Sequence, residues 1–348
     1  MSNLVLISLT LLALVVCVFV CQLAERAGTW LRVIDYPDVT GGRKRHMRPT
    51  PLMGGIAVLS AMAATAPLAV WLSGPVNTQA EAMVAIAALV GLFAFTGFID
   101  DREELSPKIR LVIMLLGAGF VVHNQPALTV QFLHFDFLRN AYILGGWGIV
   151  FTLLALVGLA NAVNMADGKN GLVIGMCLVW NTVLLLFGAP IVIPILVLSL
   201  AAVSAAFVYN MRGRLFLGDT GSFGLACFYG LIAIYSYTQN FVRLPADVIA
   251  LMFMVPVLDC LRLMISRVLR GSSPFSAGRD HLHHHIAASV GWTSGLFLYL
   301  GLIAVPLALR LVFPEFAGAA VAIQASGYCF VLSICAYGAY SNMRDMAA

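Results

Sequence analysis

The sequence predicts an all-α polytopic integral membrane protein, on the basis of its composition and hydropathy. Of the 348 residues, 61% are hydrophobic and only 10% are charged, and the mean hydropathy is +0.95. Soluble globular domains do not have this composition. A spanning helix needs about 20 largely apolar residues, so the chain has room for about eleven such helices joined by short loops. We therefore expect a single transmembrane domain over residues 1–348 and no sizeable soluble domain.

Apolar runs along the chain predict where these helices lie. The first run has no basic segment before it and is long enough to cross a bilayer, so we interpret it as a membrane helix and not as a cleaved signal. Eleven runs of this kind place the two termini on opposite sides of the membrane. The predicted spans are residues 4–24, 52–72, 82–99, 109–123, 143–160, 171–187, 191–210, 222–240, 247–267, 294–312 and 318–340.

The distribution of lysine and arginine predicts the orientation of the chain. Cytoplasmic loops are enriched in these residues. With eleven spans, only Arg139, Arg243 and Arg310 of the 20 Lys and Arg residues fall on the side of the N-terminus. The N-terminus is therefore expected outside the cytoplasm and the C-terminus inside it. The inside segments are then residues 25–51, 100–108, 161–170, 211–221, 268–293 and 341–348.

Three further features narrow the class of protein. Residues 129–137, on the outward side, alternate polar and apolar positions, which is typical of a short β-hairpin or an interfacial segment. The seven cysteines fall in apolar runs without metal-ligand spacing, so we expect neither disulfides nor redox chemistry. The formal net charge of +4 is modest and gives no sign of nucleic-acid binding.

The first acidic motif on the inside is Asp100-Asp101, at the end of the third predicted span. Adjacent aspartates repel each other, and they are tolerated best when a cation or a basic side chain lies between them. Lys108 and Arg110 follow and are candidates for that partner or for a phosphate ligand. The alternative is a solvated helix end with ordinary charges.

A second polar motif ends the fifth span. Asn161, Asn164 and Asp167 recur every third residue, so a helix would place them on one slowly turning face. Amide and carboxylate groups together suit a sugar, a ribose or a phosphate with its metal. Gly168 and Gly171 allow a tight turn whose backbone N–H groups can approach a phosphate. The alternative is helix capping by the Asn and Asp side chains.

Two later inside segments add an aspartate and a group of histidines. Asp219, between Gly218 and the start of the eighth span, lies where glycines and a helix N-terminus favour an anion, and its carboxylate is a candidate Mg²⁺ ligand. The alternative there is a plain turn. Residues 281–285 hold four histidines, but the other candidate ligands are hard carboxylates, which suit Mg²⁺ or Mn²⁺ better than zinc.

Two charged groups remain. Asp259 lies within the ninth span, where a charge must be paired, and Arg262 is its natural partner three residues on; we interpret this pair as mainly structural. The basic run of residues 43–48 precedes a Pro- and Gly-rich break. Such a run usually marks contact with anionic lipid or membrane topology alone, and it could also hold a lipid phosphate.

Taken together, these motifs resemble the polyprenyl-phosphate N-acetylhexosamine-1-phosphate transferases. The resemblance covers nearly the whole chain and five motifs in the family's order. The His-Leu-His-His form at residues 281–284 is similar to the WecA/TagO branch rather than the MraY branch. The five motifs are residues 43–55, 97–108, 161–172, 216–222 and 279–285.

The resemblance implies an enzyme of the bacterial cytoplasmic (inner) membrane, with its active site facing the cytoplasm. It would transfer a sugar-1-phosphate from a UDP-N-acetylhexosamine, by default UDP-N-acetylglucosamine, to undecaprenyl phosphate, and release UMP. Mg²⁺, or alternatively Mn²⁺, would be its cofactor, and it would begin the synthesis of a cell-envelope polysaccharide.

The resemblance also implies roles for particular residues. The expected metal ligands are Asp219, Asp100 and Asp101. The expected catalytic residues are Asp100, Asp101, Lys108 and Asp167. The residues expected to bind substrate are His46, Arg48, Asn161, Asn164, Asn170, Arg279, His281, His283 and His284.

One departure from the family and several alternatives stay open. The family usually reads Asp-Gly-x-Asp-Gly-Leu, whereas this chain has Lys169 and Asn170 after Gly168. The lost carboxylate puts the role of Asn170 in doubt and is compatible with another UDP-N-acetylamino sugar or with an inactive scaffold protein. A CDP-alcohol transferase would need further Asp residues after Asp167, and span 171–187 has none. A lipid-phosphate transporter would need polar residues at mid-membrane. A homodimer, and a two-step path through a covalent Asp intermediate, also remain open.

Overall fold

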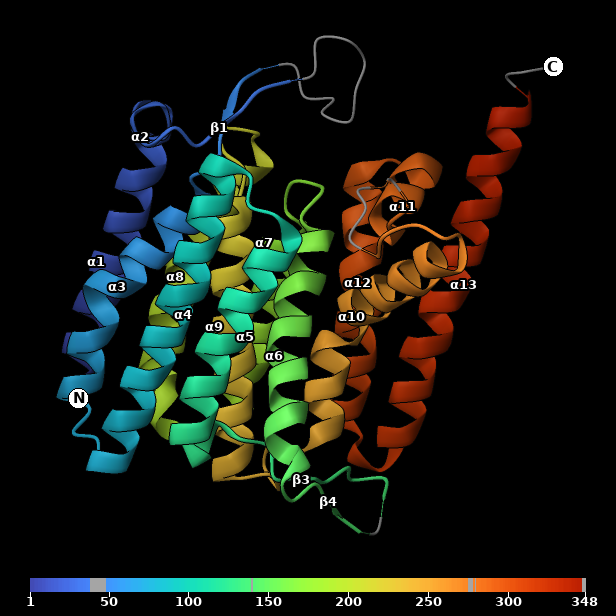
Figure 1. The fold of residues 1–348 in the computed structure, drawn as a ribbon. Coiled ribbons are helices and arrows are strands. Elements are labelled where there is room, and N and C mark those ends of the chain that lie inside the picture. Colours follow the sequence, from blue (N-terminus) through green and yellow to red (C-terminus); the bar gives the residue numbers. More distant parts are fainter. Residues whose placement is uncertain (38–47, 139, 275–277, 279, 346–348) are drawn as a thin grey trace.

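The computed structural model describes residues 1–37, 48–138, 140–274, 278 and 280–345, with side chains up to Tyr337 in the last helix. Long helices run alternately up and down one bundle, and the N-terminus and the end of the last helix lie at opposite ends of it (Figure 1). The long helices are α1 (Asn3–Gln22), α3 (Gly54–Leu72), α4 (Asn77–Glu103), α5 (Pro107–Asn124), α6 (Trp147–Ala166), α7 (Leu172–Phe187), α8 (Ile193–Met211), α9 (Gly218–Gln239), α10 (Ala246–Leu269), α12 (Trp292–Val312) and α13 (Ala317–Asp345).

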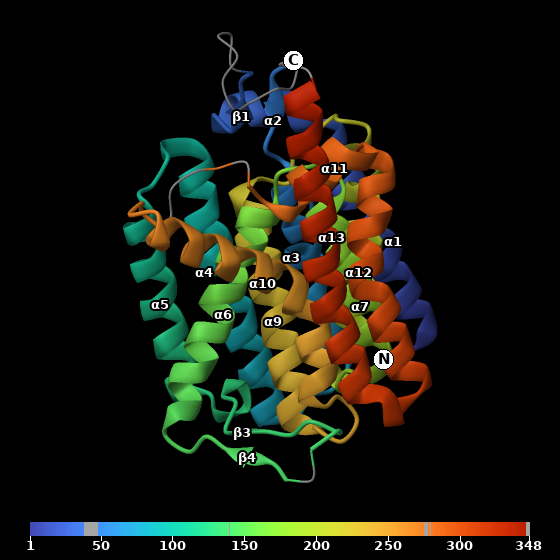
Figure 2. The same ribbon diagram turned by 90° about the vertical axis from the view of Figure 1, so that its right-hand side faces the viewer.

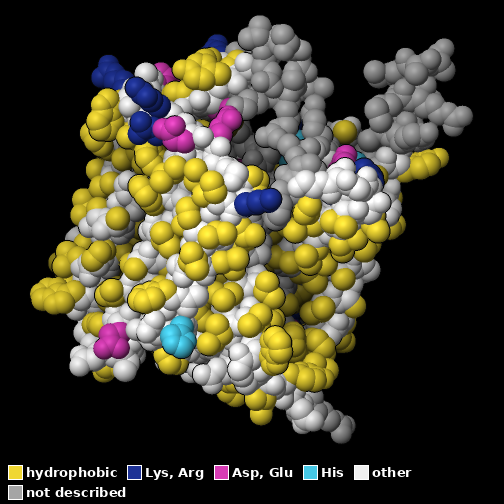
Figure 3. Space-filling view, viewed as in Figure 1, with side chains coloured by type: hydrophobic (Ala, Val, Ile, Leu, Met, Phe, Trp, Pro, Cys, Tyr) yellow, Lys and Arg dark blue, Asp and Glu magenta, His cyan; other side chains and the backbone are white. Residues whose placement is uncertain are grey.

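Hydropathy confirms a polytopic membrane protein. Within the described ranges, nine helices are long and apolar enough to cross a membrane. Two long helices, α7 and α9, are not among them. The first has only 16 residues, and the second carries many Gly, Ser, Thr and Tyr residues. Because α9 is buried along almost its whole length, against α3, α4, α6 and α7, it presents little surface to lipid and can be less apolar. Hydrophobic side chains cover the visible side of the bundle (Figure 3).

A small hairpin closes one end of the bundle. Strand β3 (Phe132–Leu133) pairs antiparallel with β4 (Tyr142–Ile143), so the hairpin predicted near residues 129–137 is confirmed. The predicted start of the fifth span at residue 143 is wrong, because that residue pairs with Phe132 in the hairpin and α6 begins only at Trp147. Short turns of 3₁₀ helix, η1 (Pro126–Leu128), η2 (Pro190–Val192) and η3 (Pro314–Phe316), occur in other connections.

The opposite end is organised around the start of α9. Strand β1 (Ile34–Asp35), which follows the short helix α2 (Ala24–Leu31), pairs with β2 (Thr50–Pro51). The N–H of Phe216 donates to the carbonyl of Pro51 (2.9 Å), and the N–H of Gly54 donates back to the carbonyl of Phe216 (2.9 Å). These backbone bonds place the starts of α3 and α9 side by side. The short helix α11 (Leu282–Val290) lies at the same end, against α12 and α13 (Figures 1 and 2).

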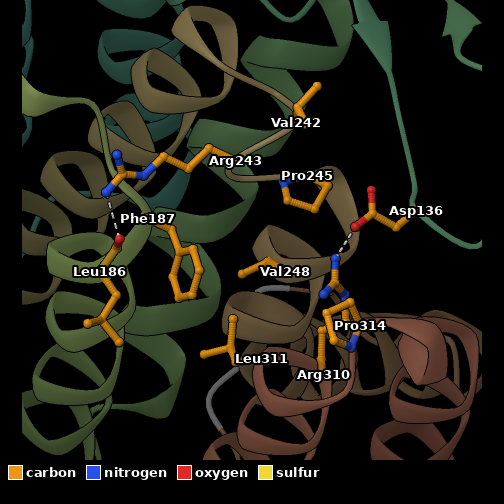
Figure 4. Close-up of a pocket in the computed structure, with 10 residues that line it drawn as sticks. All are labelled: Asp136, Leu186, Phe187, Val242, Arg243, Pro245, Val248, Arg310, Leu311 and Pro314. Carbon is orange, nitrogen blue, oxygen red and sulfur yellow. Dashed lines mark hydrogen bonds and ion pairs between the residues drawn. The ribbon is translucent and has the colours of Figure 1, made fainter.

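A buried charge network anchors the hairpin end. The Arg310 guanidinium of α12 is 4% exposed and forms ion pairs with Asp247, the second residue of α10, and with Asp136 of the hairpin connection. The backbone N–H of Asp136 also donates to the Asp247 carboxylate (2.9 Å). Asp136 and Arg310 line a pocket of about 400 Å³ that also includes Arg243 (Figure 4). The network therefore joins α10, α12 and the hairpin far from the polar motifs of the inner loops.

Arg310→Leu is expected to destabilise the protein strongly. The substitution leaves the fully buried Asp247 carboxylate without its cation, and breaking a buried ion pair costs about 3–5 kcal/mol. Arg243→Leu is the matched control, because Arg243 lines the same pocket but is exposed, and its guanidinium donates to a backbone carbonyl, that of Leu186. Thermal unfolding in detergent measures both variants. Equal losses in the two variants would contradict the buried network.

Candidate active site

Four long helices bring one group of polar residues together at the end of the bundle opposite the hairpin. We call this group the acidic cluster. It combines the end of α4 and the starts of α5 and α9 with the last turns of α6. Because α9 is the central helix, its first turn brings the motifs of separate loops into contact. The acidic cluster consists of Asp100, Asp101, Arg110, Asn164 and Asp219.

The Asp101 carboxylate caps the N-terminus of α9. It accepts hydrogen bonds from the backbone N–H of Asp219 (2.7 Å), the N–H of Thr220 (2.9 Å) and the Thr220 hydroxyl (2.8 Å). The first backbone N–H groups of a helix lack partners within the helix, and a negative charge there is also favoured by the helix dipole. The close approach requires glycine: a Cβ on Gly97 would collide with the backbone of Asp219, and Gly218 has a φ of +75°.

Arg110 joins the other two carboxylates of the cluster. Its Nη1 atom forms an ion pair with Asp100, which is only 7% exposed, and lies 3.3 Å from Oδ2 of Asp219. The guanidinium lies 5.6 Å from the centre of the Phe223 ring. On the other side, Nδ2 of Asn164 donates to Oδ1 of Asp219 (2.7 Å). Asp219 is thus held between a cation and an amide, with its backbone fixed by Asp101.

A second group, the histidine cluster, consists of His281, His283 and His284 at the start of α11. The rings of His281 and His283 stack with centroids 5.3 Å apart, and those of His283 and His284 are 4.2 Å apart. Asp259 of α10 positions this helix. Its carboxylate accepts from the backbone N–H of Leu282 and faces Nδ1 of His281, each at 3.2 Å.

Two further donors complete the surroundings of Asp259. Nη2 of Arg262 donates to it at 2.8 Å, and the Tyr328 hydroxyl of α13 donates at 3.1 Å. The predicted structural pair of Asp259 and Arg262 is therefore confirmed. The pair also has a consequence for the site, because the same carboxylate holds the first turn of the helix that carries the histidines.

His283 is the member of the histidine cluster that contacts the turn after Asp167. It is 1% exposed, and among the described residues neither of its ring nitrogens has a hydrogen-bond partner. A Cβ on Gly168 would collide with its Nε2 atom, so the ring lies directly against the turn that follows Asp167. Burial, followed by the nearby His284 and His281, holds the pKa of His283 well below its usual value of 6.5. His283 is therefore a neutral imidazole with hydrogen-bonding capacity to spare.

Asp167, at the end of α6, carries a proton more readily than an ordinary aspartate. Burial, and then the charge of Asp101, raise its pKa from 3.8 to about 7. The carboxyl group can therefore donate as well as accept a hydrogen bond near neutral pH. The end of α6 carries both Asn164, which binds Asp219, and the turn at Gly168, which contacts His283, so the two clusters border one site.

Comparisons with known proteins agree with this arrangement. The pattern that defines glycosyl transferase family 4 matches residues 82–237, which include all five residues of the acidic cluster. A Yersinia pestis protein named undecaprenyl-phosphate alpha-N-acetylglucosaminyl 1-phosphate transferase is 30% identical over 333 residues, which cover 88% of this chain and 86% of that protein. The chain belongs to glycosyl transferase family 4. The family resemblance of the five motifs is thereby confirmed.

Other members of the family give the same result. An Escherichia coli K12 protein of the same name is 30% identical over 299 residues, or 83% of this chain and 77% of that protein. A Bacillus subtilis 168 protein, named probable undecaprenyl-phosphate N-acetylglucosaminyl 1-phosphate transferase, is 26% identical over 283 residues, or 80% of this chain and 76% of that protein. Family and relatives together identify the chain as a sugar-phosphate transferase.

Several residues expected at the site are exposed or make contacts outside the two clusters. Lys108 is exposed two residues before Arg110 in α5, about half a helical turn away. Nδ2 of Asn161 donates to the carbonyl of Val157 in its own helix (2.8 Å). The carbonyl of Asn170 accepts from Nε1 of Trp292 (2.8 Å), which ties the turn to α12. Arg48 is exposed at the start of the segment leading to α3. His46 and Arg279 lie outside the described residues.

Sequence reasoning did not assign site roles to three groups that the fold brings in. The Thr220 hydroxyl binds Asp101, the Ser222 hydroxyl accepts from Asn164 (3.1 Å), and the Tyr328 hydroxyl binds Asp259. The first two lie within the Gly-Asp-Thr-Gly-Ser motif, so their position beside Asp219 was a usable signal. Tyr328 lies on the last long helix in an apolar run, and no local signal marks it.

Part of the acidic cluster fits a hard divalent cation. Among the described residues no three His, Cys, Asp or Glu side chains form a metal cage. Mg²⁺, however, is commonly bound by one or two carboxylates together with waters and substrate phosphates. Asp100 and Asp219 face the same cationic nitrogen of Arg110, so their oxygens converge on a position that already holds positive charge. Asp101 differs from them, because the N-terminus of α9 engages both of its oxygens.

Asp101→Ala is expected to loosen the start of α9. Loss of a helix cap costs about 0.5–2 kcal/mol, and here the two N–H groups of Asp219 and Thr220 lose their acceptor together. Hydrogen–deuterium exchange of the peptide that contains residues 217–222 should become faster. Asp101→Asn keeps one acceptor oxygen and should fall between the native protein and Asp101→Ala. Unchanged exchange in Asp101→Ala would show that the cap does not hold this turn.

The raised pKa of Asp167 predicts a specific dependence of stability on pH. The folded protein keeps a proton that the unfolded chain loses near pH 3.8, so stability declines as the pH rises toward the folded pKa of about 7 and levels off above it. Asp167→Asn has no titrating group at this position. Melting temperatures in EDTA, measured from pH 5 to pH 9, should show the native protein losing stability relative to Asp167→Asn up to about pH 7. A constant difference across this range would contradict the shift.

Proposed function

We propose that this enzyme transfers N-acetylglucosamine-1-phosphate from UDP-N-acetylglucosamine to undecaprenyl phosphate, releasing UMP. The observation that carries the proposal is the convergence of Asp100 and Asp219 on Arg110, beside a buried neutral histidine. Phosphoryl transfer needs positioning and charge neutralisation more than covalent chemistry. The names of the Yersinia and Escherichia relatives supply the sugar and the lipid in this proposal.

The proposed reaction is a single in-line displacement. An oxygen of the lipid phosphate forms a bond to the sugar-bearing phosphorus, while the bond from that phosphorus to the bridging oxygen breaks. UMP leaves with that oxygen and the bonding electron pair. The second pKa of a phosphate monoester is about 6, so the lipid phosphate is mostly doubly deprotonated at pH 7. The attack therefore needs no strong general base. The charges on the two sides of the reaction are equal.

The acidic cluster is proposed to hold the phosphates through cations. Arg110 has five N–H donors and uses one nitrogen for Asp100 and Asp219, so its remaining donors can bind phosphoryl oxygens. Asp100 and Asp219 would hold Mg²⁺, which supplies positive charge against the pyrophosphate oxygens when bound. Asp101 is proposed to act through Asp219 by fixing the first turn of α9, and not as a nucleophile.

The other cluster is proposed to orient the donor. The unpartnered nitrogens of His283 can bond the sugar or the pyrophosphate, and His281 and His284 flank it. Asn164 and Asp167 lie at the end of α6, and together with the turn after it they are proposed to contact the nucleotide side. The fixed positions of both clusters follow from Asp101 and Asp259, which cap α9 and α11 from neighbouring helices.

We propose that the eleven long helices each span the bacterial inner membrane, with the site facing the cytoplasm. Two findings support this orientation. The N-terminus and the end of α13 lie at opposite ends of the bundle, as an odd number of spans requires (Figure 1). On the face shown in Figure 3, the Lys and Arg side chains gather toward the end of the bundle that carries the acidic cluster, as the positive-inside rule requires. All residues used in the proposed reaction come from one chain, so the mechanism does not depend on a homodimer.

Purified protein in detergent with Mg²⁺ and undecaprenyl phosphate should release UMP from UDP-N-acetylglucosamine. A donor panel with UDP-N-acetylgalactosamine and a UDP-deoxy-amino sugar tests whether Lys169 and Asn170 alter the choice of sugar. Asp219→Asn should lower the rate by at least about 100-fold, because it removes charge that faces the phosphates. Glu103→Gln is the matched control: this exposed carboxylate lies on the last turn of α4, outside the cluster, and its loss should leave the rate unchanged.

Three outcomes contradict the proposal. UMP release that does not require the lipid would indicate hydrolysis. A labelled phospho-enzyme formed with the UDP-sugar alone would replace the single displacement with a two-step path through an aspartate. Failure to release UMP from any donor, in protein that unfolds cooperatively on heating, would exclude UDP-N-acetylhexosamines as substrates.

A further inference from the structure

Three sulfur atoms from two helices meet beside the candidate site. Sγ of Cys260 in α10 lies 3.4 Å from Sδ of Met165 in α6 and 3.8 Å from Sδ of Met264, one turn further along α10. We call these three residues the sulfur cluster. Cys260 is 6% exposed, whereas Met165 and Met264 are partly exposed, so the group is covered by protein and still open on one side.

The position of the sulfur cluster is set by the packing of α6 against α10. Met165 follows Asn164, and Cys260 follows Asp259, so each helix presents its sulfur one residue after a polar group of the site. In the bundle, the inner half of α10 lies beside α6 (Figure 2). Both thioether sulfurs thus contact the same thiol, one from each helix.

We propose that the sulfur cluster is a binding site for a soft monovalent metal ion, Cu(I) or its chemical analogue Ag(I). Thiolate and thioether sulfur select Cu(I) over hard ions. A metal–sulfur bond is about 2.3 Å long, so three sulfurs around one ion in a plane lie about 4 Å apart. The two observed separations from the thiol to the thioethers, 3.4 and 3.8 Å, are a few tenths of an ångström shorter than this spacing. The unbranched methionine side chains can supply that movement.

The single negative charge of the Cys260 thiolate favours a monovalent ion over a divalent one. On binding, the Cys260 thiol loses its proton to water and the ion bonds to the thiolate, while both thioethers stay neutral. One thiolate and one Cu(I) give a complex without net charge, which an apolar surrounding accepts at little cost. A divalent ion would leave one uncompensated positive charge beside the half-buried Met165. The site is independent of the proposed transfer reaction and of its Mg²⁺.

The test is Cu(I) binding by the full-length protein in detergent, without oxygen, in competition with the chelator bicinchoninate. Cys260→Ser, Met165→Leu and Met264→Leu should each weaken binding by at least about tenfold, since loss of even an outer ligand of a metal site has effects of this size. Met254→Leu, on the same helix, and Cys21→Ser, a buried thiol on α1, are matched controls that should bind as the native protein does.

X-ray absorption at the copper edge provides a second measurement that does not rely on variants. The site predicts sulfur neighbours only, at about 2.3 Å. Nitrogen neighbours would assign the copper to the histidine cluster and overturn the proposal. Binding that is lost in Cys21→Ser, or that is equal in Met165→Leu, Met264→Leu and Met254→Leu, would overturn it as well. Because no substrate is present, these results do not depend on whether the proposed transferase activity is observed.

Discussion

The contact between the Asp101 carboxylate and the first turn of α9 is the interaction on which the rest of the site depends. Helix α9 is the buried centre of the bundle, and its N-terminal N–H groups would have no partners inside the protein without an acceptor from another helix. The carboxylate of α4 supplies that acceptor and fixes Asp219 in the same step. Because Gly97 and Gly218 leave room for this approach, the backbone of α4 and the start of α9 are nearly in contact. The positions of Asp100 and Arg110 relative to Asp219 follow from it.

A carboxylate also caps the helix that carries the histidine cluster. Asp259 of α10 accepts from the first N–H of α11 and holds His281, as Asp101 accepts from the first N–H groups of α9. In both cases a carboxylate on a long helix determines where the next functional helix begins. Arg262 and Tyr328 stabilise the Asp259 carboxylate, so its charge is compensated before any substrate arrives. The turn after Asp167, with His283 against Gly168, joins the two clusters into one surface.

Pairing of charges explains how a mostly apolar bundle tolerates these groups. Arg110 neutralises Asp100 and Asp219 at one end, and Arg310 neutralises Asp136 and Asp247 at the other. An unpaired charge at either place would carry a desolvation cost that no other interaction there offsets. The two networks differ in accessibility: Asp219 remains partly open to a ligand, whereas Asp247 is fully buried and serves the fold. Arg110 therefore occupies the position of a cation that the proposed reaction uses, and Arg310 that of a structural one.

The sequence by itself determined the class of protein, the location of the long helices, the pairing of Asp259 with Arg262 and the family. These depend on local features, namely apolar runs of bilayer length, spacings along one helix and short motifs. Only the tertiary structure decided that Asp101 caps α9, that Arg110 rather than Lys108 joins the acidic cluster, that Tyr328 holds Asp259, and that Met165 meets Cys260. Each of these contacts joins residues from different helices, and Lys108 and Arg110, two residues apart in α5, point to different sides of that helix. Such contacts depend on how helices pack against one another, and neither hydropathy nor motif spacing contains that information.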